Sequence, residues 1–320
     1  MQKKYKNLYN SVNEFITKQE QRSDKPLYEL GADGARKFLE DIQKETYKEI
    51  KADISDTQIA TELAGNIELR FIRPLNALHQ KLPLIIYVHG GGWIMGSEIT
   101  HDMLLRKLCI NTNSCAAFIK YTHSPEAAFP LPFNQVYAAV DFLYKNHEVY
   151  NINPEKIILA GDSAGAGMAA AAAVRAKEEN GAKIIFQLLL YPALDINMNT
   201  PSYTEFENGP WLTKKSMEWF WKSYLQNENY YDNIYAVPMA AKDENLKGLP
   251  PALIITAEND VLRDEGEKYA IKLDNAGVEV KCARISGTCH DFMMLNALSE
   301  TSPTVLAFET VNAVLNKILQ

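Results

Sequence analysis

The sequence predicts an α/β protein with a mostly parallel central sheet that is covered by helices on both faces. Short apolar runs rich in β-branched residues recur along the chain, and stretches with helical patterning separate most of them. No linker, repeat or low-complexity tract interrupts this alternation. Strands that alternate with helices form parallel sheets, because each crossover helix covers a face of the sheet. We therefore expect one domain over residues 1–320 with an appended cap.

The expected elements follow in chain order. Residues 1 to about 50 carry helical patterning, and residues 57–73 alternate as an antiparallel strand pair with a glycine turn. The apolar runs expected to form the other strands are 84–88, 116–119, 157–160, 185–190, 252–256 and 278–285. The stretches expected to form helices are 102–110, 132–147, 164–179, 262–275 and 302–318.

One segment breaks the alternation. No buried strand is expected between Asp195 and about Pro250, where the aromatic stretch WLTKKSMEWFWKSYL has helical patterning with Thr213 as its N-cap. Residues 196–235 are therefore expected to form a cap together with residues 1 to about 50; an ordinary helical layer is the alternative. Its aromatic side chains either line a pocket or form the core of the cap, which we favour for most of them: Trp211, Trp219, Phe220, Trp221 and Tyr224.

Composition narrows the possible classes of function. The net charge is −7 with acids and bases interspersed, so nucleic acid is not an expected partner. The chain starts without the apolar core of a signal peptide, and its apolar runs are far shorter than a membrane span. We therefore expect a cytoplasmic protein with no membrane partner. The four cysteines do not make a disulfide framework. Whether the chain forms a homo-oligomer stays open.

A serine lies in the turn after the strand expected at 157–160. There the chain reads GDSAG, from Gly161 to Gly165, and an alanine-rich helical stretch follows. G-x-S-x-G between a strand and a helix is typical of a nucleophile elbow, in which a tight turn presents the serine hydroxyl. The N-terminal N–H groups of the helix point to the same place. Ser163 is therefore the candidate nucleophile, and Asp162 a supporting residue.

A dinucleotide-binding loop is the alternative explanation for these glycines, because Gly165-x-Gly167-x-x-Ala170 has a similar spacing. Such a loop has its first glycine directly at the strand end and an acid about 20 residues further on. Gly165 instead lies five residues beyond Ala160, and the next strand ends without an acid. The sequence therefore favours the serine elbow.

A glycine run, His89-Gly90-Gly91-Gly92-Trp93, follows the strand expected at 84–88. No Lys-Ser or Lys-Thr pair follows it, so a phosphate-binding loop is unsupported. Consecutive glycines let backbone N–H groups approach a substrate oxygen closely, which indicates an oxyanion hole. Ala164, directly after the serine, would add a further N–H group. His89 is expected to brace this loop.

A nucleophilic serine needs a base, and the base needs an orienting acid. On this type of sheet the chain order is serine, acid, histidine, and His290 is the one histidine after Ser163. Glu258, Asp260 and Asp264 are candidate acids, and Asp260 is favoured because it lies at the apex of the loop. The other histidines have no second ligand at metal spacing, so no metal is expected, and acyl transfer through a serine needs no cofactor.

These motifs resemble the hormone-sensitive-lipase-like branch of the α/β-hydrolases, which includes bacterial acetyl and carboxyl esterases. The matching stretches occur in the family's order over about residues 60–300: HGGGW, SPEAAFP, GDSAG, LLLYPALD, LPPALIITAENDVLRDEGEKYA and GTCHDF. The resemblance implies an α/β-hydrolase fold with a helical cap. It also implies a serine carboxylesterase that acts without a cofactor on small esters with short to medium acyl chains.

The resemblance assigns roles to particular residues. It implies a triad of nucleophile, acid and base, namely Ser163, Asp260 and His290. The implied oxyanion donors are Gly91, Gly92 and Ala164, with Gly90 shaping the loop and Glu126 giving structural support. An amidase or peptidase on the same fold is an alternative function. A non-catalytic ligand receptor is a further alternative, but the retained His290 argues against it.

Two departures from the family's usual motifs stand out. The chain has His123-Ser124-Pro125-Glu126 where the family usually has Leu-Ala-Pro-Glu, and His290-Asp291-Phe292 where it usually has His-Gly-Phe. A carboxylate beside the base would raise the pKa of the histidine by stabilising the imidazolium. Alternatively, Asp291 repels acidic substrates or points to solvent, and we favour solvent.

Overall fold

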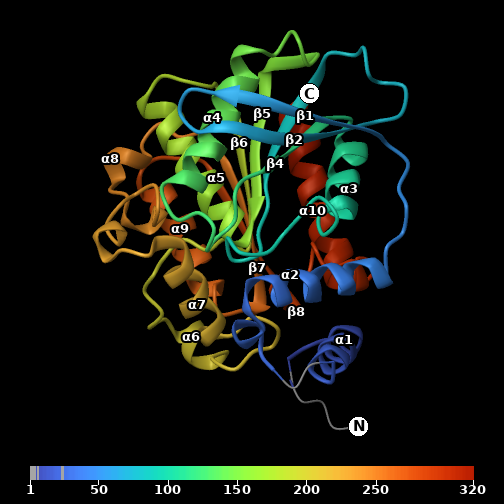
Figure 1. Ribbon diagram of the computed structural model, residues 1–320, viewed down its shortest axis with the longest axis vertical. Coiled ribbons are helices and arrows are strands. Elements are labelled where there is room, and N and C mark those ends of the chain that lie inside the picture. The colour runs from blue at the N-terminus through green and yellow to red at the C-terminus, as the bar shows by residue number, and fades with distance from the viewer. Residues whose placement is uncertain (1–4, 6, 23–24) are drawn as a thin grey trace.

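A mostly parallel sheet runs through the computed structural model, which describes residues 5, 7–22 and 25–320 (Figure 1). The strand order is β1-β2-β4-β3-β5-β6-β7-β8. β1 pairs antiparallel with β2 and β2 with β4, whereas the pairs from β4 across to β8 are parallel. The strands are β1 (Asp53–Thr61), β2 (Gly65–Arg73), β3 (Leu82–Val88), β4 (Cys115–Lys120), β5 (Ile152–Asp162), β6 (Phe186–Leu190), β7 (Ala252–Asn259) and β8 (Val280–Cys289).

Helices cover both faces of this sheet (Figure 1). Two of them contact each other on one face: α3 (Asp102–Thr112) and α10 (Ser302–Leu319). The other face carries α4 (Leu131–Lys145), α5 (Ser163–Glu178), α8 (Asp243–Leu246) and α9 (Arg263–Asn275). Because the sheet is covered twice, a central strand such as β6 is buried along its whole length. The predicted α/β architecture is therefore confirmed.

The pairing of the last two strands positions two loop residues. β8 extends to Cys289, beyond the expected end at residue 285, and Cys289 pairs with Asn259 at the end of β7. Both strands run in the same direction, so Asp260 and His290 leave the sheet at the same level. The register of β7 and β8 thus brings together side chains that lie 30 residues apart in the sequence.

Further helices lie beyond the carboxyl ends of β7 and β8 (Figure 1). They are α1 (Asn10–Glu20), α2 (Leu27–Glu45), α6 (Pro201–Glu205) and α7 (Lys214–Leu225), and α2 contacts α7. Thr213 caps α7 as expected, because its side chain accepts a hydrogen bond from the Ser216 N–H at 3.1 Å. Of the expected N-terminal cap segment, residues 1–4, 6, 23 and 24 lie outside the described residues.

Three short 3₁₀ turns complete the secondary structure of the described residues: η1 (Glu228–Tyr230), η2 (Pro238–Ala240) and η3 (Asn296–Leu298). No helix in the ranges given above is long and apolar enough to cross a membrane.

Candidate active site

Ser163 lies in a sharp turn between β5 and α5. Its φ is +50°, a left-handed conformation that costs energy in a residue with a side chain. The turn is tight at both ends. A Cβ atom on Gly161 would lie 2.7 Å from the backbone of Gly165, and one on Gly165 would lie 2.1 Å from the carbonyl oxygen of Val88. Glycine at both ends is therefore a steric requirement, which is the physical content of the G-x-S-x-G pattern.

The structure brings Ser163, His290 and Asp260 into one chain of hydrogen bonds. Nε2 of His290 lies 2.9 Å from Oγ of Ser163, and Nδ1 lies 2.7 Å from Oδ2 of Asp260. All three residues are buried, with exposed fractions of 5%, 2% and 1% for the serine, histidine and aspartate. In this arrangement Asp260 accepts the Nδ1 proton, so the free lone pair of Nε2 faces the serine hydroxyl.

The carboxylates of the other two candidate acids, Glu258 and Asp264, form hydrogen bonds with other residues. Oε2 of Glu258 accepts the N–H of Gly287 at 2.7 Å, at the start of GTCHDF. Oδ2 of Asp264 accepts the N–H of Ser202 at 2.8 Å and ties α6 to α9. Asp260 is thus the candidate whose carboxylate contacts His290.

The glycine run lies beside Ser163, and the backbone N–H groups of its three glycines differ in their hydrogen bonds. The N–H of Gly90 donates to Oδ1 of Asp162 at 2.9 Å, which fixes the loop. Gly91 and Gly92 have φ of +104° and +63° and line the same pocket as Ser163. Within the described part of the chain, nothing accepts a hydrogen bond from the N–H of Gly91 or Gly92. Ala164 follows the serine as the second residue of α5.

Asp162 joins the elbow to the glycine run through a buried carboxylate. Its Oδ1 accepts the hydroxyl of Tyr87 at 2.8 Å and the N–H of Gly90, and Nε2 of His101 lies 3.2 Å away. Burial alone would raise the pKa of Asp162, but His101 and these donors hold it below its usual value. The carboxylate is therefore ionised and satisfied. Tyr87 was missing from the sequence-based expectations because nothing in the pattern of its strand indicates a polar partner.

His89 braces the glycine loop from behind. Its Nδ1–H donates to the carbonyl oxygen of Gly90 at 2.8 Å, and its ring stacks on Tyr121 with centroids 4.2 Å apart. Burial, together with His123 and His101 nearby, lowers the pKa of His89 well below its ordinary value. A neutral imidazole that donates a hydrogen bond to the loop is consistent with the role expected from the sequence, in which His89 braces the glycine loop.

Glu126 also supports the loop, through a residue that sequence analysis missed. Its two carboxylate oxygens accept hydrogen bonds from Arg36 of α2 at 2.8 and 2.7 Å. Arg36 further donates to the carbonyl oxygens of Ile94 at 2.8 Å and Ser124 at 3.1 Å. The guanidinium lowers the pKa of Glu126 to about 2. Arg36 lies in an N-terminal segment without a recognisable motif, so only the tertiary contact reveals it.

Comparison with known proteins gives the family. A family model described as the α/β-hydrolase fold matches residues 85–294. The chain belongs to the α/β-hydrolase fold family. A protein of Acanthamoeba polyphaga mimivirus named as an α/β hydrolase is 40% identical over 90% of this chain and 82% of its own length. An esterase of Gibberella moniliformis is 30% identical over 91% of this chain and 92% of its own.

Solved structures agree with this assignment. A thermostable esterase from Pseudomonas putida has a TM-score of 0.95 and 37% sequence identity, and the match covers 99% of both chains. The resemblance to the hormone-sensitive-lipase-like branch of the α/β-hydrolases is therefore confirmed, and the protein is a hydrolase.

Asp291 points into this hydrolase's pocket rather than to solvent, contrary to the expectation from the sequence. Its side chain is 13% exposed, and its Oδ2 accepts the indole N–H of Trp211 at 2.9 Å. Its Oδ1 lies 3.3 Å from Nε2 of His290. The backbone φ of Asp291 is +62°, a left-handed conformation that glycine adopts more readily than a residue with a side chain. Sequence spacing gave no sign of the partner, Trp211.

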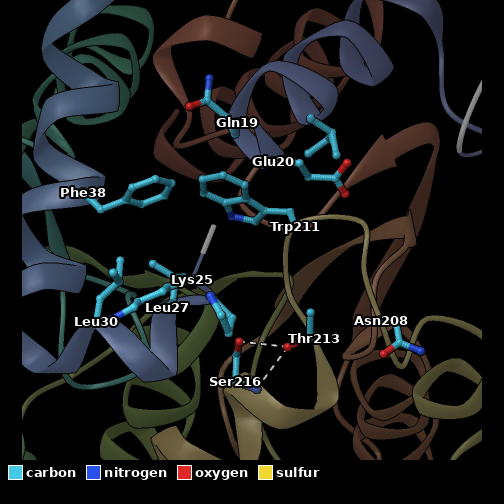
Figure 2. Close-up of a pocket in the computed structure, with 12 residues that line it drawn as sticks. Gln19, Glu20, Lys25, Leu27, Leu30, Phe38, Asn208, Trp211, Thr213 and Ser216 are labelled. Carbon is cyan, nitrogen blue, oxygen red and sulfur yellow. Dashed lines mark hydrogen bonds between the residues drawn. The ribbon is translucent and has the colours of Figure 1, made fainter. Parts of the chain in front are cut away.

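The pocket at Ser163 continues into a wider cavity. The pocket at Ser163 and a neighbouring cavity of about 280 Å³ share three lining residues: Leu27, Phe38 and Trp211. Figure 2 shows the wider cavity between residues of α1, α2 and the segment that leads into α7. Trp211 and Phe220 line the pocket at Ser163, whereas Trp221 and Tyr224 are buried against Trp93. The aromatic residues of the insertion thus divide between pocket and core. Among the described residues, the pocket included, no group of three or more His, Cys, Asp or Glu side chains is arranged to hold a metal ion.

Replacing Asp162 with alanine should impair catalysis more than substrate binding. The change removes the acceptor for Gly90 N–H and Tyr87 OH, so the glycine loop loses its anchor to the elbow. We expect kcat to fall by about 10- to 100-fold with a smaller change in KM, on the scale of a misplaced oxyanion donor. Steady-state kinetics on an ester, with circular dichroism to verify folding, would measure this. Unchanged kcat in a folded variant would contradict the anchoring role.

The pH profile should report the charge of Asp291. Burial disfavours the imidazolium, but the carboxylates of Asp260 and Asp291 raise the pKa of His290 to about 9. A histidine base works as the neutral imidazole, so with His290 as the candidate base kcat/KM should rise as the pH increases through this pKa. Asp291→Gly removes one of the carboxylates that raise this pKa and should move the acid limb to lower pH. The profile of kcat/KM between about pH 5 and 10 tests this, with Asp232→Asn on the exposed surface as control. A limb at the same pH in wild type and Asp291→Gly would refute the effect.

Proposed function

We propose that the protein is a carboxylesterase that hydrolyses esters with short to medium acyl chains through an acyl-enzyme on Ser163. The observation that carries the proposal is the hydrogen-bonded series from Ser163 Oγ through His290 to Asp260. Such a series activates a serine hydroxyl, which is otherwise a weak nucleophile. The esterases among the relatives support an ester as the substrate class.

In the first half of the reaction, Oγ of Ser163 attacks the carbonyl carbon of the ester while its proton moves to Nε2 of His290. The carbonyl oxygen becomes an oxyanion. His290 then gives the proton to the oxygen of the leaving alcohol, the bond from carbon to that oxygen breaks, and the acyl group stays on Ser163. Asp260 keeps the imidazole in the required tautomer and stabilises the imidazolium between these two proton transfers.

In the second half, water takes the place of the alcohol. His290 removes a proton from the water, whose oxygen attacks the acyl carbon, and the proton then returns to Oγ of Ser163 as the acid leaves. Each proton that His290 accepts is given back, so the route uses no cofactor.

The N–H groups of Gly91, Gly92 and Ala164 are the proposed donors to the oxyanion. Their support is the left-handed backbone of the two glycines beside Ser163 and the place of Ala164 at the start of α5. Donors that are held in place before the reaction stabilise developing charge without reorganisation. Gly90, whose N–H is already bound to Asp162, shapes the loop instead.

We also propose that residues 1 to about 50 and 196–235 act as the cap of one hydrolase domain. Leu27 and Phe38 of α2, together with Trp211 and Leu212 of the insertion, line the pocket and would limit the size of the acyl chain. The cytoplasmic location expected from the sequence stays a prediction.

An amidase or peptidase is the second candidate, because the same triad serves both bond types. Amides have a poorer leaving group, and no residue described above is specific for the amine. Comparing p-nitrophenyl acetate with p-nitroacetanilide separates the two functions: we expect turnover of the ester and little of the anilide. The reverse preference would replace the esterase proposal.

Ser163→Ala should lower kcat on p-nitrophenyl acetate by at least about 10³-fold, because the variant lacks the nucleophile. Labelling with a fluorophosphonate should mark wild type and not the variant, which also tests the non-catalytic receptor alternative. A series of p-nitrophenyl esters of increasing acyl length would bound the pocket. Wild-type rates in Ser163→Ala would refute the proposed mechanism.

A further inference from the structure

The wall of the catalytic pocket is largely apolar, and Asp291 places a carboxylate in it. The apolar lining consists of Leu27, Phe38, Leu39, Met95, Leu212 and Phe220. Oδ2 of Asp291 has a donor in the indole of Trp211. Oδ1 is buried, and among the described residues it accepts no hydrogen bond, although Nε2 of His290 is 3.3 Å away. A buried carboxylate oxygen without a donor is unfavourable, so a donor brought by a ligand would stabilise it.

The charges around His290 are mostly negative. Asp260 contacts its Nδ1, Asp291 lies beside its Nε2, and Asp162 acts on it from further away. Tyr191 packs against the imidazole with ring centroids 5.0 Å apart and brings no charge that offsets these carboxylates. Of the three carboxylates, Asp162 is paired with His101. When His290 is the neutral base, Asp291 is left with Trp211 alone. The negative charge around His290 would therefore attract a cation supplied by the substrate.

The geometry places this negative charge near the alcohol part of the ester. His290 donates its proton to the leaving oxygen, which must come within about 3 Å of Nε2. Oδ1 of Asp291 is 3.3 Å from the same nitrogen. The leaving oxygen is therefore within about 6 Å of Oδ1 in any productive pose, by adding that reach to the measured distance. A group two carbons beyond the leaving oxygen can reach Oδ1, and it would displace no protein donor.

We propose that Asp291 is a specificity-determining residue that selects esters of amino alcohols. A protonated amine about two carbons from the ester oxygen donates to Oδ1, and an alcohol that carries a carboxylate there is repelled. The inference rests on the proposed esterase function and extends it to a substrate class. It requires Asp291 to be ionised when the substrate binds.

Three acetate esters of nearly equal shape test the proposal. 3-Methylbutyl acetate is neutral, 2-(dimethylamino)ethyl acetate carries a protonated amine at neutral pH, and 3-acetoxypropanoate carries a carboxylate. The measurement is kcat/KM for each ester, divided by the value for the neutral ester. This ratio cancels any change in the basicity of His290, because all three esters use the same base.

Asp291→Asn is the matched variant. Asparagine tolerates the left-handed backbone and can still accept the Trp211 N–H, so charge is the main change. Relative to wild type, we expect the ratio for the amine ester to fall about tenfold and that for the carboxylate ester to rise about tenfold, the scale of a partly screened charge pair. Asp291→Gly also removes the charge, so it should shift each ratio in the same direction as Asp291→Asn does. This second variant tests the proposal if Asp291→Asn does not fold. Asp232→Asn, which removes an exposed charge, should leave both unchanged.

Equal ratios in wild type and Asp291→Asn would overturn the selection by charge while leaving the esterase function intact. Equal shifts in Asp232→Asn would overturn it as well, because the effect would then be one of net charge. If wild type hydrolyses none of the three esters, including the neutral one, the proposed function fails and the inference fails with it.

Discussion

The carboxylate of Asp162 is the contact on which the geometry of the site depends. It lies at the end of β5, directly before Ser163, and binds Tyr87 of β3, Gly90 of the glycine loop and His101 before α3. A buried charge is tolerated only where several partners satisfy it, so these groups cannot shift independently. Ser163 and the glycine loop beside it are thereby held in a fixed arrangement, and the other residues of the site are placed around them.

Much of the sheet and of the candidate site could be predicted from the sequence, because both follow local rules. Strand and helix periodicity gave the alternation, and the glycines around Ser163 marked a turn that sterics allow only for glycine. Chain order gave His290. The acid was harder, since Glu258, Asp260 and Asp264 have the same chemistry. The register that pairs Asn259 with Cys289 separates them, and register is a property of the assembled sheet.

What the sequence did not reveal are contacts between distant segments. Arg36 reaches Glu126 across 90 positions, and Trp211 reaches Asp291 across 80. Neither pair has a local pattern, because a single hydrogen bond between segments leaves no periodicity. Asp291 was expected in solvent because a charged residue in a loop is usually exposed. Its enclosure comes from distant segments, since residues of α2 and of the insertion line the same pocket.

The left-handed backbone at Asp291 also bears on how this enzyme could diverge. A φ of +62° suits glycine, and among residues with side chains asparagine and aspartate bear it best. Each aspartate codon, GAU or GAC, differs by a single base from a glycine codon, GGU or GGC. A charge beside His290 can therefore appear or vanish in one mutational step, with the loop, the strands and the hydrogen bonds of His290 to Ser163 and Asp260 left in place. A substitution at position 291 alone could therefore change the substrate preference, without a change at any other residue.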